Sequence, residues 1–75
     1  MSKMIIWSKA QCPACEQAKG LLSKSSIEFE ERKIGNGWTK EDLLAVVPSA
    51  RAVPQIIVDG KHIGGVAELT KYLQG

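Results

Sequence analysis

The sequence is short of cysteine, of aromatic residues and of long apolar runs. Only two of its 75 residues are Cys, whereas a secreted mini-protein held together by disulfides carries several. No run approaches the ~20 apolar residues of a membrane-spanning helix, and the run 1–7 has one Lys and too few apolar residues for a signal peptide. The formal net charge is only +2, so neither nucleic acid nor a membrane is an expected partner. We therefore expect a cytoplasmic protein.

The chain is expected to form one domain, spanning residues 1–75, and to act as a monomer. Its apolar fraction of 44% and charged fraction of 24% are ordinary for a globular domain. Apolar residues are spread along the whole length, which argues against long disordered segments.

Seven secondary-structure elements are indicated by short apolar runs that alternate with amphipathic stretches. Strands are predicted at 3–8, 27–33, 55–58 and 61–63. Helices are predicted at 14–25, 39–47 and 66–73. The first helix is predicted to bury one apolar face, formed by Ala14, Ala18, Leu21 and Leu22. Thr39, followed by Asp42, resembles the N-cap of the second helix.

The order β-α-β-α-β-β-α constrains the topology of the sheet. The first two strands are joined by a helix and must therefore be parallel, with a right-handed crossover. The last two strands flank Asp59-Gly60, a strong two-residue hairpin turn, and are antiparallel. Ile27 and Phe29 alternate with charged residues, so their strand is half-buried or at an edge. The prediction is an α/β fold with a mixed four-stranded sheet and helices on both faces.

The motif Cys12-Pro13-Ala14-Cys15 lies where the first strand passes into the first helix. Pro is well placed in a first helical turn, where its missing N–H costs nothing. A thiolate at Cys12 would face unpaired N–H groups and the positive end of the helix dipole, which lowers the thiol pKa from its free value of ~8.5. Lys9 adds a nearby positive charge. Cys15 is expected to be more buried and less acidic, so the pair provides an attacking and a resolving thiol.

Two other interpretations of the cysteine pair are weaker. Structural zinc requires four ligands, and the only other soft ligand in the sequence is His62, so no metal site is expected. An inert pair in the core is disfavoured by Pro13 at the helix start and by the buried strand before it. Redox chemistry is therefore preferred over metal binding, and metal binding over an inert pair.

Two further features each have a structural and a functional interpretation. Val53-Pro54 precedes the third strand; it can be a simple strand start, or a cis bond that presents the Val53 backbone outward. Gly64-Gly65 precedes the last helix; it can be a tight turn for close packing, or an anion site formed by exposed N–H groups. The sequence alone leaves both choices open.

For three side chains outside these motifs, we prefer a purely structural interpretation. Trp7 ends the first strand and is expected in the core. Trp38 precedes the second helix and is expected to cover the end of the core, although an exposed Trp could grip a protein substrate. His62 is expected on the surface of the hairpin.

Together these motifs resemble those of the glutaredoxins: Cys-Pro-x-Cys from Cys12, Val-Pro-Gln-Ile from Val53 and His-Ile-Gly-Gly from His62. The resemblance covers essentially the whole chain, 3–73, and the string 51–65 is its most specific part. The short length is most similar to small glutaredoxins of bacteria and their phages. The resemblance implies the thioredoxin fold and no permanently bound cofactor.

The same resemblance implies roles for individual residues. Cys12 is the nucleophile, Cys15 the resolving thiol, and Pro54 a cis-proline packed beside them. The implied activity is that of a dithiol–disulfide oxidoreductase, with glutathione as reductant. Its implied substrates are intracellular protein disulfides and glutathione mixed disulfides, with ribonucleotide reductase as the family precedent.

A groove for glutathione is also implied. Lys9 would lie near the glycine carboxylate of the tripeptide, with Arg51 and Gln55 as weaker candidates for the same end. Val53 would pair with the cysteinyl backbone, and Gln11 is a further candidate contact.

At the other end of the groove, the segment with Gly65 would hold the γ-glutamyl carboxylate through the N–H groups of Val66 and Ala67. The family usually has Asp or Ser where this chain has Ala67, a side chain that would help to hold the glutathione amino group. Glu68 follows and can compensate.

Three alternatives to glutathione-dependent reduction remain. The weakened γ-glutamyl site motivates a glutaredoxin-like protein that is reduced by a flavin-containing reductase. The small Ala14 inside the motif motivates an iron–sulfur cluster carrier in which two protomers bridge a cluster through Cys12. A purely structural or binding role is the least favoured, because Cys12, Pro13 and Cys15 are all present.

Overall fold

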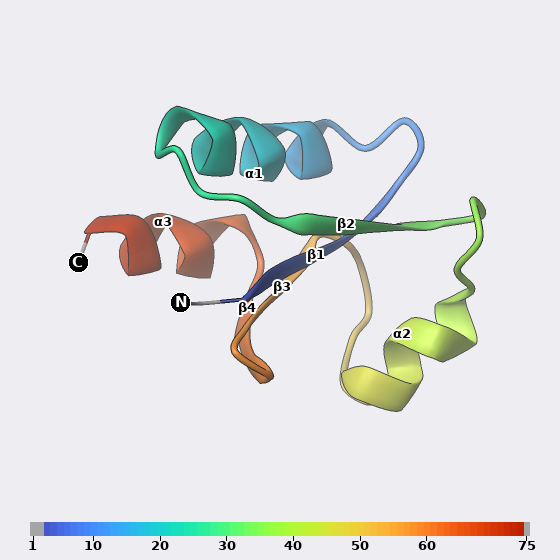
Figure 1. Cartoon of the computed structure of the whole chain (residues 1–75). Coiled ribbons are helices and arrows are strands. Elements are labelled where there is room, and N and C mark those ends of the chain that lie inside the picture. The colour runs from blue at the N-terminus through green and yellow to red at the C-terminus, as the bar shows by residue number, and fades with distance from the viewer. Residues whose placement is uncertain (1–2, 75) are drawn as a thin grey trace.

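The computed structural model describes residues 3–74 and consists of a central sheet with helices packed on both faces (Figure 1). The elements follow in the order β1 (Met4–Lys9), α1 (Pro13–Lys24), β2 (Glu30–Ile34), α2 (Lys40–Val46), β3 (Gln55–Val58), β4 (Lys61–Gly64) and α3 (Val66–Gln74). The strand order is β2-β1-β3-β4, with β1 and β2 parallel and the other two pairs antiparallel. The predicted element order and mixed sheet are confirmed. In the described part of the chain, no helix is long and apolar enough to cross a membrane.

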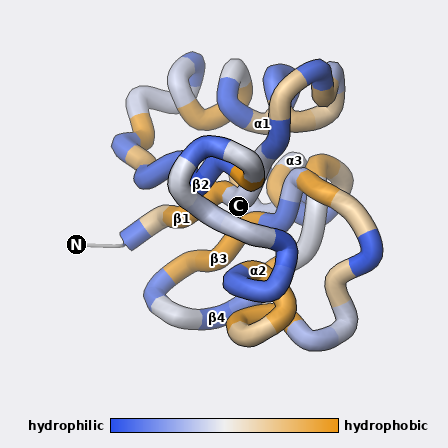
Figure 2. Tube along the Cα trace, turned by 90° about the vertical axis from the view of Figure 1, so that its right-hand side faces the viewer, coloured by the Kyte–Doolittle hydropathy of each residue, from blue (hydrophilic) through white to orange (hydrophobic). Residues whose placement is uncertain are grey.

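The central strand β1 supplies apolar side chains to both layers, because successive residues of a strand point to opposite faces. Met4 and Ile6 join the cluster under α1 and α3, whereas Ile5 and Trp7 join the cluster under α2. Figure 1 shows α1 and α2 on opposite sides of the sheet, and Figure 2 shows the apolar segments of β1 and β3 between them. The end of β1 is thus held rigidly from both faces.

The first helix begins one residue before its predicted start, and its predicted buried face is confirmed except at Ala14. Its fully buried residues are Cys15, Ala18 and Leu22, while Leu21 is only partly buried. Ala14 was expected on this face and is exposed. The prediction was wrong because Cys15 takes the inward position of the first turn. A cysteine with no exposed surface packs as a small apolar side chain.

Strand β2 begins three residues later than predicted, at Glu30 rather than Ile27. Its parallel register with β1 starts where Ile5 lies opposite Glu30. Ile27 and Phe29 lie before the strand and pack against the cluster under α1 and α3. They are therefore partly buried by packing against this cluster and not by the alternation of a strand. The predicted edge position of β2 is confirmed.

The second helix is held at its start by a capping box. The Asp42 N–H donates to Thr39 Oγ1 at 3.1 Å, and the Thr39 N–H donates to Asp42 Oδ2 at 2.9 Å. The predicted cap is confirmed, although the helix itself is slightly shorter than predicted.

Both tryptophans pack in the layer under α2. Trp7 has no exposed surface, and its ring meets the half-buried ring of Trp38 edge to face, with centroids 5.3 Å apart. The Arg32 guanidinium lies 4.5 Å from the Trp38 centroid and is paired with Glu30. The preferred core interpretation of Trp7 and packing interpretation of Trp38 are confirmed.

Candidate active site

Cys12 and Cys15 form a disulfide at the start of α1, with their Cα atoms 5.2 Å apart. Cys12 is the N-cap of the helix, and the Cys15 N–H donates to Cys12 Sγ at 3.2 Å. Cys12 is 8% exposed, whereas Cys15 has no exposed surface. A substrate can therefore reach only the sulfur of Cys12, and that sulfur lies at the positive end of a helix dipole.

The loop before β3 forms the opposite wall of the site. The Val53–Pro54 peptide bond is cis. The Val53 carbonyl oxygen lies 3.8 Å from Cys12 Sγ, within reach of a thiol hydrogen when the pair is reduced. Val53 is half-buried and Pro54 is buried. The loop therefore places a backbone edge directly beside the reactive sulfur.

Side chains of the hairpin tie this loop down. Gln55 Nε2 donates to the Ala52 carbonyl oxygen at 2.8 Å, and His62 Nε2 lies 2.6 Å from Gln55 Oε1. Gln55 was a weaker candidate for the glycine carboxylate of glutathione. In the structure, the side-chain amide of Gln55 instead holds the loop through its hydrogen bond to Ala52. The predicted surface position of His62 is confirmed.

The Gly64-Gly65 segment passes close to both the loop and Glu68. A Cβ atom on Gly65 would lie 3.4 Å from the Pro54 carbonyl oxygen, and one on Gly64 would meet the Glu68 side chain within 2.5 to 2.8 Å. Gly64 also has a φ of +124°, a conformation that favours glycine. Gly64 is therefore required by its backbone conformation, whereas a Cβ on Gly65 would make only ordinary contacts.

Glu68 caps α3 from within the helix. Its Oε1 atom accepts the Gly65 N–H at 2.8 Å. This hydrogen bond, followed by one from the Glu68 backbone, lowers the pKa of the Glu68 carboxyl. Gly65 was expected among the contacts to a ligand carboxylate, but its N–H is already paired. The N–H groups of Val66 and Ala67 belong to the first turn, where no helical carbonyl is available to them.

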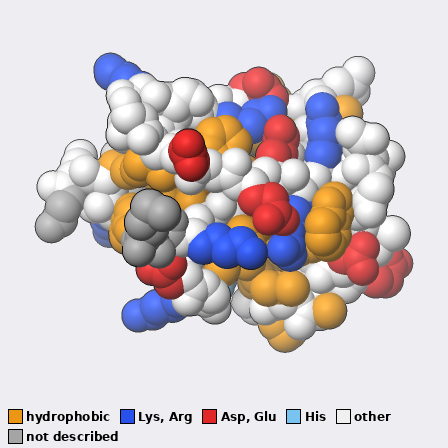
Figure 3. Space-filling model, in the orientation of Figure 1, with side chains coloured by type: hydrophobic (Ala, Val, Ile, Leu, Met, Phe, Trp, Pro, Cys, Tyr) orange, Lys and Arg blue, Asp and Glu red, His pale blue; other side chains and the backbone are white. Residues whose placement is uncertain are grey.

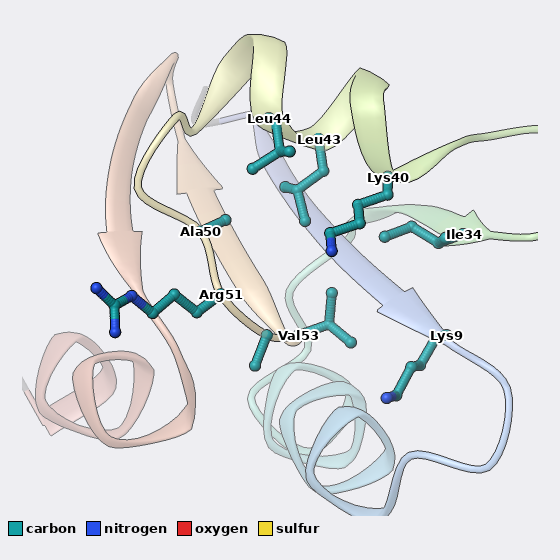
Figure 4. Close-up of a pocket in the computed structure, with 9 residues that line it drawn as sticks. Lys9, Ile34, Lys40, Leu43, Leu44, Ala50, Arg51 and Val53 are labelled. Carbon is teal, nitrogen blue, oxygen red and sulfur yellow. The ribbon is translucent and has the colours of Figure 1, made fainter.

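A cleft of about 220 Å³ lies between α2, the end of β1 and the loop before β3. Figure 4 shows the side chains that line it. Three residues singled out from the sequence, Lys9, Arg51 and Val53, are among them. The Arg51 head group, however, points away from Lys9, toward the side of α3 (Figure 4). Lys9 and Val53 therefore lie in one cleft, whereas the guanidinium group of Arg51 points away from Lys9.

Lys40 also lines this cleft and was missed in the sequence analysis. Its side chain reaches from the start of α2 toward Val53 (Figure 4). A lysine in the first turn of a helix opposes the helix dipole, and this unfavourable placement was the available signal. The remaining candidate, Gln11, lies exposed in the loop before Cys12 with a φ of +55°.

A buried hydroxyl anchors the strand that carries Lys9. Ser8 has no exposed surface, and its Oγ donates to Glu31 Oε2 at 2.6 Å. Lys19 of α1 pairs with the same carboxylate oxygen at 2.9 Å. The Ser8 hydrogen bond first, and the Lys19 hydrogen bond second, lower the pKa of Glu31. The end of β1 is thereby fixed to both β2 and α1.

A dicysteine at a helix N-terminus beside a cis-proline loop, on a mixed four-stranded sheet, defines the class of thiol–disulfide oxidoreductases with the thioredoxin-like fold. The family model described as Glutaredoxin matches residues 4–63. The chain belongs to the glutaredoxin family.

Individual relatives agree with this assignment. Glutaredoxin 3 of Escherichia coli (strain K12) is 36% identical over 69 residues, which cover 92% of this chain and 83% of that protein. Glutaredoxin-C4 of Arabidopsis thaliana is 35% identical over 68 residues, which cover 84% of this chain but only 49% of that protein. The chain thus spans about half the length of the plant relative.

Solved structures confirm the predicted thioredoxin-like fold. The crystal structure of Glutaredoxin 1 from Francisella tularensis complexed with cacodylate has a TM-score of 0.84 and is 27% identical, covering 99% of this chain and 94% of that one. The structure of a buckwheat glutaredoxin–glutathione complex has a TM-score of 0.83 and is 22% identical, covering 97% of this chain and 69% of that one.

Proposed function

We propose that this protein is a glutathione-dependent dithiol–disulfide oxidoreductase that reduces protein disulfides and glutathione mixed disulfides. The observation that carries the proposal is the asymmetry of the cysteine pair. Cys12 caps α1, accepts a hydrogen bond from the Cys15 N–H and is the more exposed of the two, whereas Cys15 has no exposed surface. These are the properties required of an attacking thiolate and of a resolving thiol that acts only within the protein.

The reaction follows from this geometry. The Cys12 thiolate attacks one sulfur of the substrate disulfide, and the other sulfur leaves as a thiolate. The Cys15 thiolate then attacks Cys12 Sγ and displaces the bound substrate thiol, which leaves the Cys12–Cys15 disulfide. One glutathione thiolate reopens this disulfide by bonding to Cys12. A second glutathione attacks the first at its sulfur, releases glutathione disulfide and restores the Cys12 thiolate.

The walls of the site support a particular placement of glutathione. Lys9 provides a cation for the glycine carboxylate, and the Val53 backbone lies beside the sulfur for the cysteinyl residue. The N–H groups of Val66 and Ala67 are available for the γ-glutamyl carboxylate. Because Glu68 accepts the Gly65 N–H through Oε1, its second carboxylate oxygen remains available to accept the glutathione ammonium group. A buckwheat protein of this fold is known as a glutathione complex.

The test is the glutathione-dependent reduction of hydroxyethyl disulfide, followed through NADPH consumption by glutathione reductase. Wild type should turn over, Cys12→Ser should be inactive, and Cys15→Ser should retain activity toward glutathione mixed disulfides. Ser23→Ala, a substitution at an exposed position of α1, is the control and should turn over as fast as wild type. A folded wild type that shows no turnover would end the glutathione proposal.

Reduction by a flavin-containing reductase is the second candidate. It is favoured by Ala67, which offers no side-chain group to the glutathione amino group. Its signature would be a Cys12–Cys15 disulfide that resists glutathione but is reduced by a flavoenzyme and NADPH.

The wider setting is also part of the proposal. We expect a cytoplasmic monomer, with no permanent cofactor, that reduces protein disulfides such as that of ribonucleotide reductase. Sedimentation of the reduced protein and a direct assay with an oxidised reductase test these points separately.

A further inference from the structure

The cleft lined by Lys9, Lys40 and Val53 is larger than the binding of one carboxylate requires. Its volume is about 220 Å³, and an apolar cavity of about 150 Å³ accommodates a benzene molecule. There is therefore room for an apolar side chain, the size of Leu or Phe, together with a polar group at the mouth. Glutathione has no side chain of this kind on its glycine.

The floor of the cleft is apolar and is formed by Ile34, Leu43, Leu44, Ala50 and Val53. Leu43 is buried in the layer under α2, whereas Leu44 is only half-buried. Val46, farther along the same helix, is 49% exposed. Hydrophobic side chains gather over α2 on the face shown in Figure 3. The apolar lining thus continues onto an accessible surface.

The charged residues that line the cleft are all cations. Lys9 and Lys40 both extend toward Val53 (Figure 4). Across residues 3–74, ion pairs are formed by Lys19 and Arg32 and leave these two lysines without a carboxylate. A carboxylate supplied from outside would pair with these cations.

Val53 connects the cleft to the reacting sulfur. Its side chain lines the cleft, and its carbonyl oxygen lies 3.8 Å from Cys12 Sγ. A peptide held on Cys12 by a disulfide would therefore place a residue next to its own cysteine at the cleft.

We propose that this cleft selects protein substrates in which the reacting cysteine is flanked by an apolar residue and an acidic residue. The apolar side chain occupies the floor, and the carboxylate binds between Lys9 and Lys40. The proposal rests on the thiol–disulfide exchange proposed above but requires no glutathione. In the selective step, a bond forms between Cys12 Sγ and the peptide sulfur while the other sulfur leaves as a thiolate.

The test uses short blocked peptides whose single cysteine carries a 2-thiopyridyl leaving group. In separate peptides, the pair Leu-Glu, Leu-Gln or Gly-Gln is placed either directly before or directly after the cysteine. Reduced protein is mixed with each peptide without glutathione, and the release of 2-thiopyridone gives the rate constant. On at least one side, Leu-Glu should react roughly fivefold faster than Leu-Gln, since two exposed ion pairs each contribute a small factor.

Added salt and single substitutions test whether the residues of the cleft cause the preference for Leu-Glu. About 1 M salt should remove the advantage of Glu over Gln, and this measurement needs no variant. Lys40→Gln should reduce the same ratio at least twofold, and Leu44→Asp should remove the advantage of Leu over Gly. The control Lys71→Gln, an exposed change on α3, should leave every ratio as in wild type.

Equal rate constants for all peptides, or a Glu preference that survives in Lys40→Gln, would overturn the proposal. Because glutathione is absent, a protein that uses another reductant still gives a valid result. A protein that releases no 2-thiopyridone from any peptide would contradict both this proposal and the proposed activity, whereas release without preference contradicts only this one.

Discussion

Replacing Gly64 by Ala should destabilise the protein by roughly 1–3 kcal/mol. Gly64 has a φ of +124°, and a side chain there costs about this much in backbone strain. The new Cβ would also lie 2.5 Å from Glu68 Cγ. Glu68 must therefore swing away and give up the Gly65 N–H, which adds to the loss. A chain of 75 residues has a total stability of roughly 4–11 kcal/mol, so the loss is a large fraction.

Urea unfolding followed by the fluorescence of the two tryptophans, Trp7 and Trp38, measures this loss. In thermal unfolding, the melting temperature should fall by about 4–24 °C. Gly20→Ala is the matched control: a Cβ at Gly20 meets nothing within 4 Å, and the substitution should stabilise α1 by about 0.5–1 kcal/mol.

A double-mutant cycle tests the assigned cause. If Glu68 is displaced by the new methyl group, Gly64→Ala should cost less in a Glu68→Ala background than in wild type, since the hydrogen bond is already absent there. Additive costs, within about 0.5 kcal/mol, would refute the collision with Glu68. A Gly64→Ala protein as stable as wild type would refute the reasoning as a whole.

Three further predictions concern the core, the polar anchor of β1 and the reactive thiol. Leu22 has no exposed surface, so Leu22→Ala should cost about 2–5 kcal/mol in urea unfolding; a loss below 1 kcal/mol would contradict its place in the core. Ser8→Ala removes a hydrogen bond to a charged group and should cost about 1.5 kcal/mol at neutral pH. Because Ser8 lowers the pKa of Glu31 from its usual value near 4.5, this stabilisation is present above that value and is lost as the pH falls through the folded pKa. The stabilities of wild type and Ser8→Ala should therefore converge in acid, and a constant difference would be inconsistent with this assignment. In reduced Cys15→Ser, the pH dependence of iodoacetamide alkylation should give Cys12 a pKa below the ~8.5 of a free thiol. A Cys12 pKa equal to that of a free thiol would contradict activation by the helix N-terminus.

The order of elements and the position of the cysteine motif could be predicted because both depend on local rules. Pro13 suits a first helical turn, and the Asp59-Gly60 turn requires a hairpin. The cap formed by Thr39 and Asp42 is likewise local, and it is present in the structure.

The errors arose where packing, rather than periodicity, decides the environment. Ala14 and Cys15 are adjacent and both small, and which of them faces inward depends on how α1 sits on the sheet. Ile27 and Phe29 alternate with charges as a strand would, but they lie beyond the register that β1 offers to β2.

The parts of the site that escaped prediction are assembled from distant segments. Lys40 lines the same cleft as Lys9 only because α2 packs against β1. The hydrogen bonds of Gln55 to Ala52 and His62 depend on the loop before β3 and on the hairpin register. The position of Lys40 at a helix start was a signal for that residue alone; neither arrangement is set by spacing along the chain.

The central claim is that Cys12 alone exchanges disulfides with glutathione, while Cys15 acts only on Cys12. The most direct measurement is the mass of the adducts that reduced Cys15→Ser and Cys12→Ser form with glutathione disulfide, followed by peptide mapping. We predict one glutathione on Cys12 in Cys15→Ser and none on the buried Cys15 in Cys12→Ser. An unmodified Cys15→Ser, or equal modification of the two variants, would contradict the account.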